Sequence, residues 1–433
     1  MAATDGDAEH GSTASGHDPK SSADLGHVPV SLREIALGFA KVGTVGFGGG
    51  LGMLALLRNE VVERRRWLDD EHFCVGVALG QMLPGPFVSN YAEYIGYELR
   101  GGRGMVTAHV SLMLPCFVLM LVLSVLYFRF GSLGLVTRLF SGIQPVVVGI
   151  LAWATWSIGR ANIRNWRSLA IGVIAAAALF LKVDALLVVV GCGILGMVLN
   201  GKGPRDRGIK GPSEDETEVK SQKPKAKSQN GRGRRANGER RMAFVPWLPV
   251  LLFAAVAAGP SVWEKAGELA YVFLKIGAAA FGGGFAAIPF LQREVVDIRH
   301  WLTMKEFIDG VALGQVTPGP VAITGAFIGY KVLGIPGAVI AYLGTFLPSF
   351  LMLLGLIRVY RRVQYNRAVQ GFLSGVMPAV TGMILTATVF VGKSAITGPA
   401  PAVVAPLVLC LLLRFNVEPV WLILGGALVG LAF

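Results

Sequence analysis

Two lysines and two runs of glycine are the residues of this chain whose types and spacing could hold a negatively charged ligand. The runs, each with a preceding phenylalanine, are Phe47, Gly48, Gly49 and Gly50, and Phe281, Gly282, Gly283 and Gly284. Lys41 and Lys275 lie six residues before them. Glycine lets a backbone amide approach a ligand closely because it has no Cβ, and an ionisable residue in apolar surroundings is by default a functional candidate. The spacing predicts an anion site.

Both features also have structural explanations. Glycines allow two helices to pack closely in a membrane. A lysine side chain can extend to the bilayer surface, or it can pair with a carboxylate on the same helix face. Glu34 and Glu268 lie seven residues before Lys41 and Lys275, respectively, which places them on that face. The sequence leaves both explanations open.

A second motif follows each glycine run and combines a glutamine with two prolines. Its residues are Gln81, Pro84, Gly85 and Pro86 in the first copy, and Gln315, Thr317, Pro318, Gly319 and Pro320 in the second. A helix that restarts after such a break directs free N–H groups and the positive end of its dipole at the break, which suits an anion. The polar residues Ser89, Asn90 and Thr324 lie close by. Each polar side chain here either contacts a ligand or satisfies loosened backbone.

The motifs recur because the chain is an internal duplication. The second copy follows the first at an offset of 234 residues, which becomes 233 just after the prolines. Trp67 and Trp301 are also equivalent, and we interpret them as anchors at the membrane surface. Helix breakers at matching positions in two hydrophobic halves point to the substrate site of a secondary transporter.

The elements that carry these motifs are expected to be broken helices. Residues 73 to 99 form one apolar segment, but the prolines divide it into two halves. Each half spans roughly 16 to 20 Å at 1.5 Å per residue, which is too short for a ~30 Å hydrocarbon core. A re-entrant hairpin is therefore predicted there, and a second break is predicted at the glycines of residues 32 to 57. Non-helical backbone at this depth must be buried in protein or line a polar cavity, so we expect a cavity between the four breaks.

The composition indicates an all-α polytopic membrane protein. Of the 433 residues, 53% are hydrophobic and 15% are charged, which suits several spans in a lipid bilayer. The net charge of +13 is concentrated in residues 201 to 241, which contain 13 Lys or Arg and 6 Asp or Glu. This segment has no aromatic residues to stack on bases, so nucleic-acid binding is not expected. Its basicity predicts a cytoplasmic location.

The chain is accordingly divided into four parts. Residues 1–30 are predicted to be a disordered tail, 31–200 the first membrane repeat, 201–243 a basic cytoplasmic linker, and 244–433 an extra span followed by the second repeat. The extra span at 244 to 259 has no partner in the first copy. It would place the second repeat upside down, and the distribution of arginines between the loops agrees with this inverted topology.

Other chemistry is weakly represented. Cys74, Cys116, Cys192 and Cys410 are scattered without metal-ligand spacing, so neither a metal nor a cofactor is expected. No nucleophile, carboxylate pair or phosphate-binding loop supports an enzyme. Glu93 is present in the first copy only, where Ala326 is its counterpart, and it is a candidate proton site.

The compound pattern Phe-Gly-Gly-Gly, then Gly-Gln-x-x-Pro-Gly-Pro, in both halves resembles the long-chain chromate ion transporter (CHR) family. The resemblance implies that the chain exports chromate, a tetrahedral dianion, across a bacterial inner membrane and gives chromate resistance. By position, the family motif includes Lys41, Phe47 to Gly50, Trp67, Gly80, Gln81 and Pro84 to Pro86, with Lys275, Phe281 to Gly284, Trp301, Gly314, Gln315 and Pro318 to Pro320 as partners in the second copy. The alternatives are a carrier for uptake of sulfate or another oxyanion, and a membrane-embedded enzyme. A homodimer is one assembly that we consider.

Overall fold

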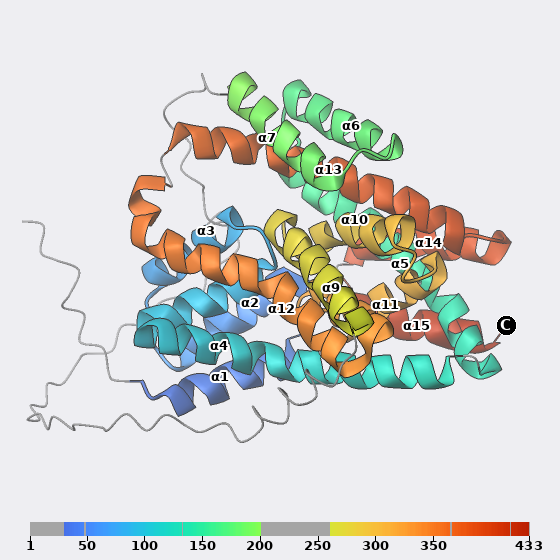
Figure 1. The fold of residues 1–433 in the computed structure, drawn as a ribbon, viewed down its shortest axis with the longest axis horizontal. Helices are drawn as coiled ribbons and strands as arrows, with labels where there is room; N and C mark the ends of the chain where they lie inside the picture. The colour runs from blue at the N-terminus through green and yellow to red at the C-terminus, as the bar shows by residue number, and fades with distance from the viewer. Residues whose placement is uncertain are drawn as a thin grey trace, which may run out of the picture.

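The computed structural model describes residues 30–46, 49–131, 133–200, 260–363, 366–415 and 417–432 (Figure 1). All regular elements in these ranges are helices, as the sequence predicted. The first repeat comprises α1 (Leu32–Val45), α2 (Gly49–Arg58), η1 (Asn59–Arg64), α3 (Asp70–Met82), α4 (Phe87–Phe130), α5 (Gly134–Asn162), α6 (Trp166–Phe180) and α7 (Ala185–Asn200). The second comprises α9 (Pro260–Ala279), η3 (Gly284–Ala286), α10 (Ala287–Gln292), η4 (Arg293–Ile298), α11 (Met304–Val316), η5 (Val321–Ile323), α12 (Thr324–Val363), α13 (Arg367–Ala395), α14 (Pro399–Phe415) and α15 (Pro419–Ala432).

Several sequence predictions fall outside the described residues. These are residues 1–29 of the disordered tail predicted for 1–30, the basic linker with the extra span at 244 to 259, and the site residues Phe47 and Gly48.

The helices are interrupted at the prolines and glycines, as the sequence predicted. In the first repeat, α3 ends at Met82 and α4 begins at Phe87, with Pro86 in an extended conformation at its N-cap. Gly85 has a φ of 89° and its equivalent Gly319 a φ of 119°, a region that favours glycine. The glycine breaks separate α1 from α2 and α9 from η3.

The two repeats are related by an approximate two-fold axis. The amide of Gly85 donates to the Ala280 carbonyl at 2.8 Å, and the equivalent amide of Gly319 donates to the Gly46 carbonyl at 3.0 Å. Reciprocal contacts of this kind are the signature of two-fold symmetry. The backbone breaks of the two repeats therefore hold each other at the axis.

The axis relates the long helices in antiparallel directions. His109 of α4 lies 5.8 Å from Phe350 of α12, and Phe117 lies 5.0 Å from Tyr342, measured between ring centroids. Along these contacts the residue numbers rise in α4 and fall in α12, so the two helices are antiparallel, as the ribbon also shows (Figure 1). This is the inverted arrangement that the sequence predicted.

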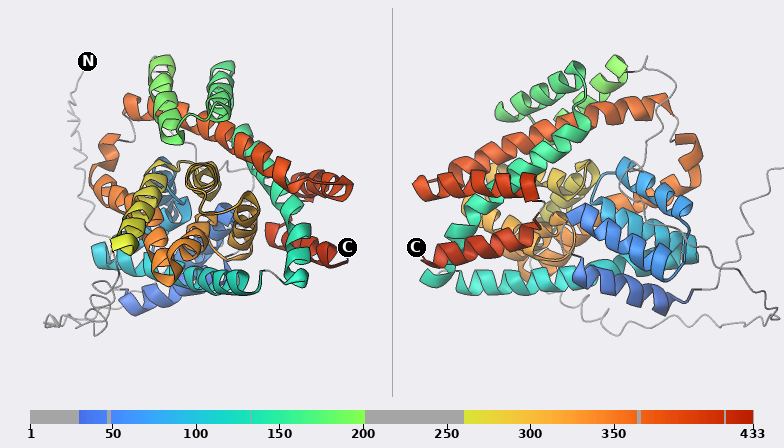
Figure 2. Two further views of the ribbon diagram at one scale, coloured as in Figure 1. Left: turned by 45° about the vertical axis from the view of Figure 1, so that its right-hand side comes forward. Right: turned by 180° about the vertical axis from the view of Figure 1, so that it is seen from behind.

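The last two helices of each repeat pack against the other repeat, which the sequence did not predict. In both views of Figure 2, α6 and α7 lie against α13. Correspondingly, α14 and α15 pack against α5. Glycines allow the contact, because a Cβ on Gly375 would lie 2.0 Å from the Cys192 carbonyl oxygen and one on Gly142 would lie 2.1 Å from that of Gly426.

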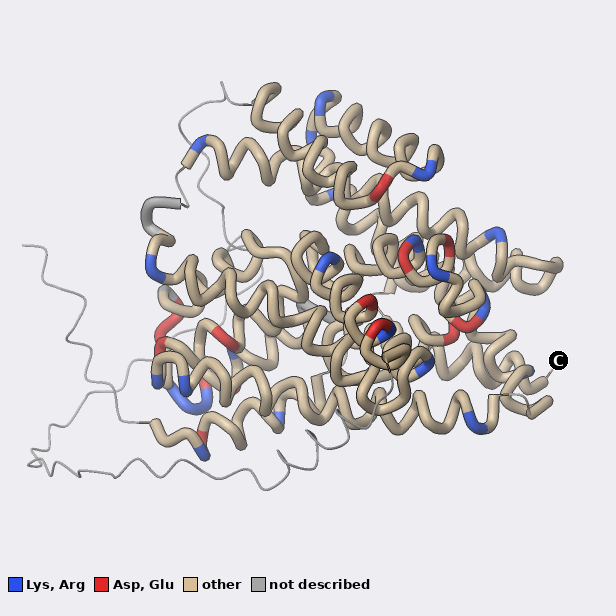
Figure 3. The backbone as a smooth tube through the Cα atoms, viewed as in Figure 1, with Lys and Arg blue, Asp and Glu red and all other residues tan. Residues whose placement is uncertain are grey.

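The distribution of charge fits a membrane protein. Within the described residues, four helices, α4, α5, α12 together with η5, and α13, are long and apolar enough to cross a bilayer. Charged residues form one group at the left of the view and another right of its centre, and they are sparser elsewhere (Figure 3). The ends of α5 and α12 and the kink of α4 carry many arginines, and the positive-inside rule predicts a cytoplasmic location for them.

Candidate anion site between the interrupted helices

A cavity of about 280 Å³ lies where the proline breaks of both repeats meet the glycine break of the second. Six of the predicted site residues line it, namely Gln81, Pro86, Gly282, Gly284, Gln315 and Pro320. Among the described residues that line this cavity, none carries a formal charge. A ligand would therefore meet backbone and neutral polar groups.

Three helices begin at the wall of the cavity. Phe87 and Val88 are the first residues of α4, Val321 is the first of η5, which leads into α12, and Pro419 is the first of α15. First-turn N–H groups have no intrahelical acceptor, and each helix start carries a partial positive charge of roughly half a unit. The amides of Ser89 and Asn90 are already used by the Pro86 carbonyl. This geometry favours an anion.

The two equivalent glutamines bring side-chain amides to the same wall. Gln315 is only 9% exposed, and its Nε2 has no hydrogen-bond partner among the described residues. A buried polar group without a partner is uncommon because its desolvation is not compensated. Gln81 lines the cavity from the first repeat. Gln315 thus places a buried N–H group without an acceptor beside the cavity.

The cavity continues along the last turns of α5. Trp153, Ser157 and Asn162 line this part, and the Trp153 ring packs edge-on against Phe285 with 6.5 Å between centroids. Asn162 is the last residue of α5, next to Arg160 and the arginines that follow. The cavity therefore extends to the end of α5 that the positive charges assign to the cytoplasm.

The equivalent path along α13 is occupied by an aromatic pair. Phe390 stands at the position equivalent to Ser157, and its ring lies 5.3 Å from that of Phe180. The residues of α13 are not among those that line the cavity. The two repeats therefore give the described cavity one long arm, along α5.

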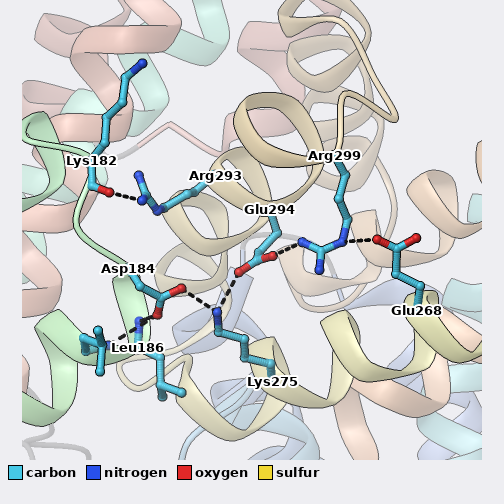
Figure 4. Close-up of polar contacts among 9 residues, drawn as sticks. Lys182, Asp184, Leu186, Glu268, Lys275, Arg293, Glu294 and Arg299 are labelled. Carbon is cyan, nitrogen blue, oxygen red and sulfur yellow. Dashed lines mark hydrogen bonds and ion pairs between the residues drawn. The ribbon is translucent and has the colours of Figure 1, made fainter.

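Lys275 lies outside this cavity in a network of ion pairs (Figure 4). Its Nζ lies 2.8 Å from Glu294 and 2.6 Å from Asp184 at the start of α7. Glu294 also pairs with Arg299, which reaches Glu268 at 2.8 Å. The network fixes the π-helical turn η4 to α9 and to the loop before α7.

The first repeat contains the same network in shorter form. Lys41 lies 3.0 Å from Glu60 on the π-helical turn η1, and Glu60 also pairs with Arg64 and Arg65. Neither lysine pairs with the glutamate on its own helix face. Glu34 forms a capping box with Ser31, and Glu268 binds Arg299. The lysine partners lie on another helix, which a same-face argument does not consider.

The remaining predicted site residues have other neighbours. Gly85, Gly319, Pro84 and Phe281 form the contact between the two repeats, with Pro84 and Phe281 in an isolated bridge. The hydroxyl of Thr317 donates to the Leu313 carbonyl at 2.8 Å.

Three further predicted positions belong to the breaks themselves. Gly283 packs against the cavity-lining Phe87, where an added Cβ would lie 2.7 Å from the ring. Gly49 and Gly50 begin α2, and Pro318 precedes the Gly319 contact. None of them is among the residues that line the cavity.

Sequence reasoning missed the α5 wall of the cavity. Trp153, Ser157 and Asn162 have the counterparts Thr386, Phe390 and Ala395 in the second repeat. A search for residues shared by both copies cannot find positions at which the copies differ. Glu93, the candidate proton site, is fully buried and hydrogen-bonds to His109, which the sequence also did not indicate.

The comparisons with known proteins agree with this architecture. The sequence matches the Chromate transporter family over residues 33–197 and 267–431, one match per repeat. It is 31% identical to the chromate transport protein of Cupriavidus metallidurans over 93% of both chains. It is 30% identical to the probable chromate transport protein of Synechococcus elongatus, over 86% of this chain and 87% of that one.

A shorter relative matches about a third of the chain. The uncharacterized transporter YwrA of Bacillus subtilis is 33% identical over 35% of this chain and 86% of its own. No solved structure matches the chain. Because the family match covers both repeats and the similarity to full-length relatives extends over nearly the whole sequence, the chain belongs to the chromate transporter family.

Proposed function

We propose that this protein is a secondary transporter of the bacterial inner membrane that exports chromate from the cytoplasm and thereby gives chromate resistance. The observation that carries the proposal is Gln315, whose buried amide has no partner among the described residues and which lines the cavity together with the first residues of α4 and η5. The family membership supplies the substrate class.

The neutral lining suits a carrier. Chromate presents four oxygens that accept hydrogen bonds, and helix N-termini with amide side chains can bind such a group without a cation. A buried cation would hold a dianion strongly in a low-dielectric site, whereas a carrier must release its substrate on the far side. Sulfate has the same shape and charge, so we expect it to compete.

The direction of export is supported by the arm of the cavity along α5. It extends toward the arginine-rich end of the helix, so substrate would enter from the cytoplasm. An inside-negative potential favours this direction, because moving one charge yields about 2.3 kcal/mol per 100 mV. For a dianion this gives roughly 4 to 5 kcal/mol, or a concentration ratio on the order of 10³.

Chromate accumulation in cells tests the proposal. Cells that express the protein should contain less chromate than cells that do not, and Gln315→Leu should abolish most of this difference. A hydrogen bond to a charged group is worth about 1.5 to 3 kcal/mol, so the affinity should fall by roughly 10- to 150-fold. Thr317→Val is the matched control, because its hydroxyl is bound to Leu313 and it does not line the cavity.

The outcomes separate the alternatives. More chromate in expressing cells would indicate uptake and would refute export. If Gln315→Leu transports chromate as well as the wild type does at equal amounts in the membrane, the cavity is not part of the transport path. Competition by sulfate in proteoliposomes would show whether the site distinguishes the two oxyanions.

A further inference from the structure

A chain of three polar side chains lies at the two-fold axis, where α4 crosses α12. Glu93 Oε1 is 2.8 Å from His109 Nδ1, and His109 Nε2 is 2.9 Å from the hydroxyl of Tyr342. Glu93 is fully buried, and His109 is 9% exposed. The rings of Phe346 and Phe350 each lie 5.8 Å from that of His109. This is a connected polar chain in an aromatic setting.

This chain of polar side chains is not symmetric between the two repeats. His109 and Tyr342 are equivalent positions, 233 residues apart, so they meet at the axis itself. Glu93 has no acidic counterpart, because Ala326 stands at the equivalent position. The duplicated packing of α4 on α12 therefore does not require a carboxylate. Glu93 therefore adds a carboxylate of the first repeat alone to a pair of residues that meet at the axis.

Glu93 is able to take up a proton. Its second oxygen, Oε2, is buried without a hydrogen-bond partner among the described residues. An ionised carboxylate in such a place is costly to desolvate unless a positive group lies beside it. One proton shared by Glu93 and His109 makes the pair neutral, and a second proton, bound at Oε2 with formation of one O–H bond, makes it singly positive.

The neighbouring elements contribute few competing charges. Among the described residues, His109 is the titratable side chain that hydrogen-bonds to Glu93. From α12 the titratable neighbour is Tyr342, and Cys116 of α4 lies beside it. From α1, Lys41 is held in its own ion pair. The proton balance of the site is therefore set by the Glu93 and His109 pair.

The site is linked to the cavity through one helix. Glu93 lies less than two turns after Val88, and both belong to the first half of α4. Asn90, between them, directs its Nδ2 toward the carbonyls of Gly80 and Pro84 at 3.4 and 3.5 Å. Protonation at Glu93 thus changes the charge of the half-helix whose N-terminus lines the anion cavity.

We propose that Glu93, His109 and Tyr342 form the binding site of a coupling proton, which enters the cell as chromate leaves. The inference rests on the proposed export function. Exchange is the direction that uses both gradients, because an inside-negative, outside-acid membrane drives a dianion outward and a proton inward. Glu93 and His109 carry the proton, and Tyr342 positions the imidazole.

Reconstituted full-length protein tests the proposal. Proteoliposomes are clamped at zero potential with potassium and valinomycin, and a pH gradient is imposed while radiolabelled chromate is followed. We expect the gradient to drive chromate through the wild type. Glu93→Gln should lose this response but retain exchange of labelled for unlabelled chromate, which requires no net proton movement. Glu98→Gln, on the same half-helix, is the matched control and should respond as the wild type does.

Each result decides a separate point. Wild-type transport that follows voltage but ignores the pH gradient would refute proton coupling and leave export intact. A normal pH response in Glu93→Gln would refute the site. Wild-type protein that neither exchanges chromate nor moves it under voltage would refute the proposed function itself. If Glu93→Gln does not fold, His109→Gln is measured in the same way, and retention of its pH response would overturn the proposal.

Discussion

At the scale of single residues, the two repeats use equivalent lysines in unequal surroundings. The side chain of Lys41 is 52% exposed, and its partner Glu60 also has two arginines. Lys275 is 15% exposed and holds both Glu294 and Asp184. Both lysines neutralise a buried glutamate on a π-helical turn. Their role in the structure is to fix the segment that follows the glycine break.

We expect Lys275→Ala to destabilise the protein more than Lys41→Ala. Removing one partner of a buried ion pair costs about 3 to 5 kcal/mol, whereas an exposed pair contributes about 1 kcal/mol or less. The midpoint of thermal unfolding in detergent should therefore fall clearly for Lys275→Ala and little for Lys41→Ala. Equal shifts would show that the exposure of the lysine does not govern its contribution.

At the scale of elements, the long helices α4 and α12 are kinked at equivalent glycines. Gly101 has φ and ψ of 58° and −150°, and Gly334 has 62° and −148°. No atom lies within 4 Å of a Cβ added at either position. Backbone conformation, and not lack of space, thus requires glycine at the kinks. The kink ends the re-entrant hairpin and begins the span that crosses the axis.

Alanine substitutions at neighbouring glycines isolate this backbone effect. Gly101→Ala should destabilise the protein by about 1 to 3 kcal/mol, because this conformation is almost restricted to glycine. Gly102 is helical and equally free of neighbours, so Gly102→Ala should be neutral or stabilise by up to about 1 kcal/mol. Thermal unfolding of both variants in detergent measures the difference. A destabilised Gly102→Ala would contradict the explanation.

At the scale of the whole molecule, the inverted repeats exchange their last helices. The pairs α6 with α7 and α14 with α15 each complete the packing of a long helix from the other repeat. The anion cavity likewise takes its walls from both repeats. Neither half of the chain therefore lines this candidate site alone.

Cysteine labelling measures the predicted orientation. Glu63 and Asp297 are equivalent and exposed on η1 and η4. In a background without the four native cysteines, Asp297→Cys should react with a membrane-impermeant maleimide in intact cells. Glu63→Cys should react only after permeabilisation, because the arginine-rich side faces the cytoplasm. Labelling of both from the same side would rule out the inversion.

The sequence alone was sufficient to predict the duplication, the helical membrane class, the breaks and the inverted relation of the repeats. These properties depend on local chemistry. Prolines interrupt a helix wherever they occur in its interior, apolar length specifies a span, and arginines orient loops. The resemblance of the repeated motif to one family was also confirmed, because the family match covers both repeats.

Only the tertiary structure decided which side chains meet at those breaks. Lys41 and Lys275 form ion pairs with glutamates on the π-helical turns η1 and η4. Trp153 and Ser157 of the distant helix α5 complete the cavity. His109 and Tyr342 meet across the axis with 233 residues between them. Such contacts follow from how whole helices pack, and helix packing is fixed by surfaces built from residues far apart in the chain. Local sequence patterns do not specify which distant residues come into contact.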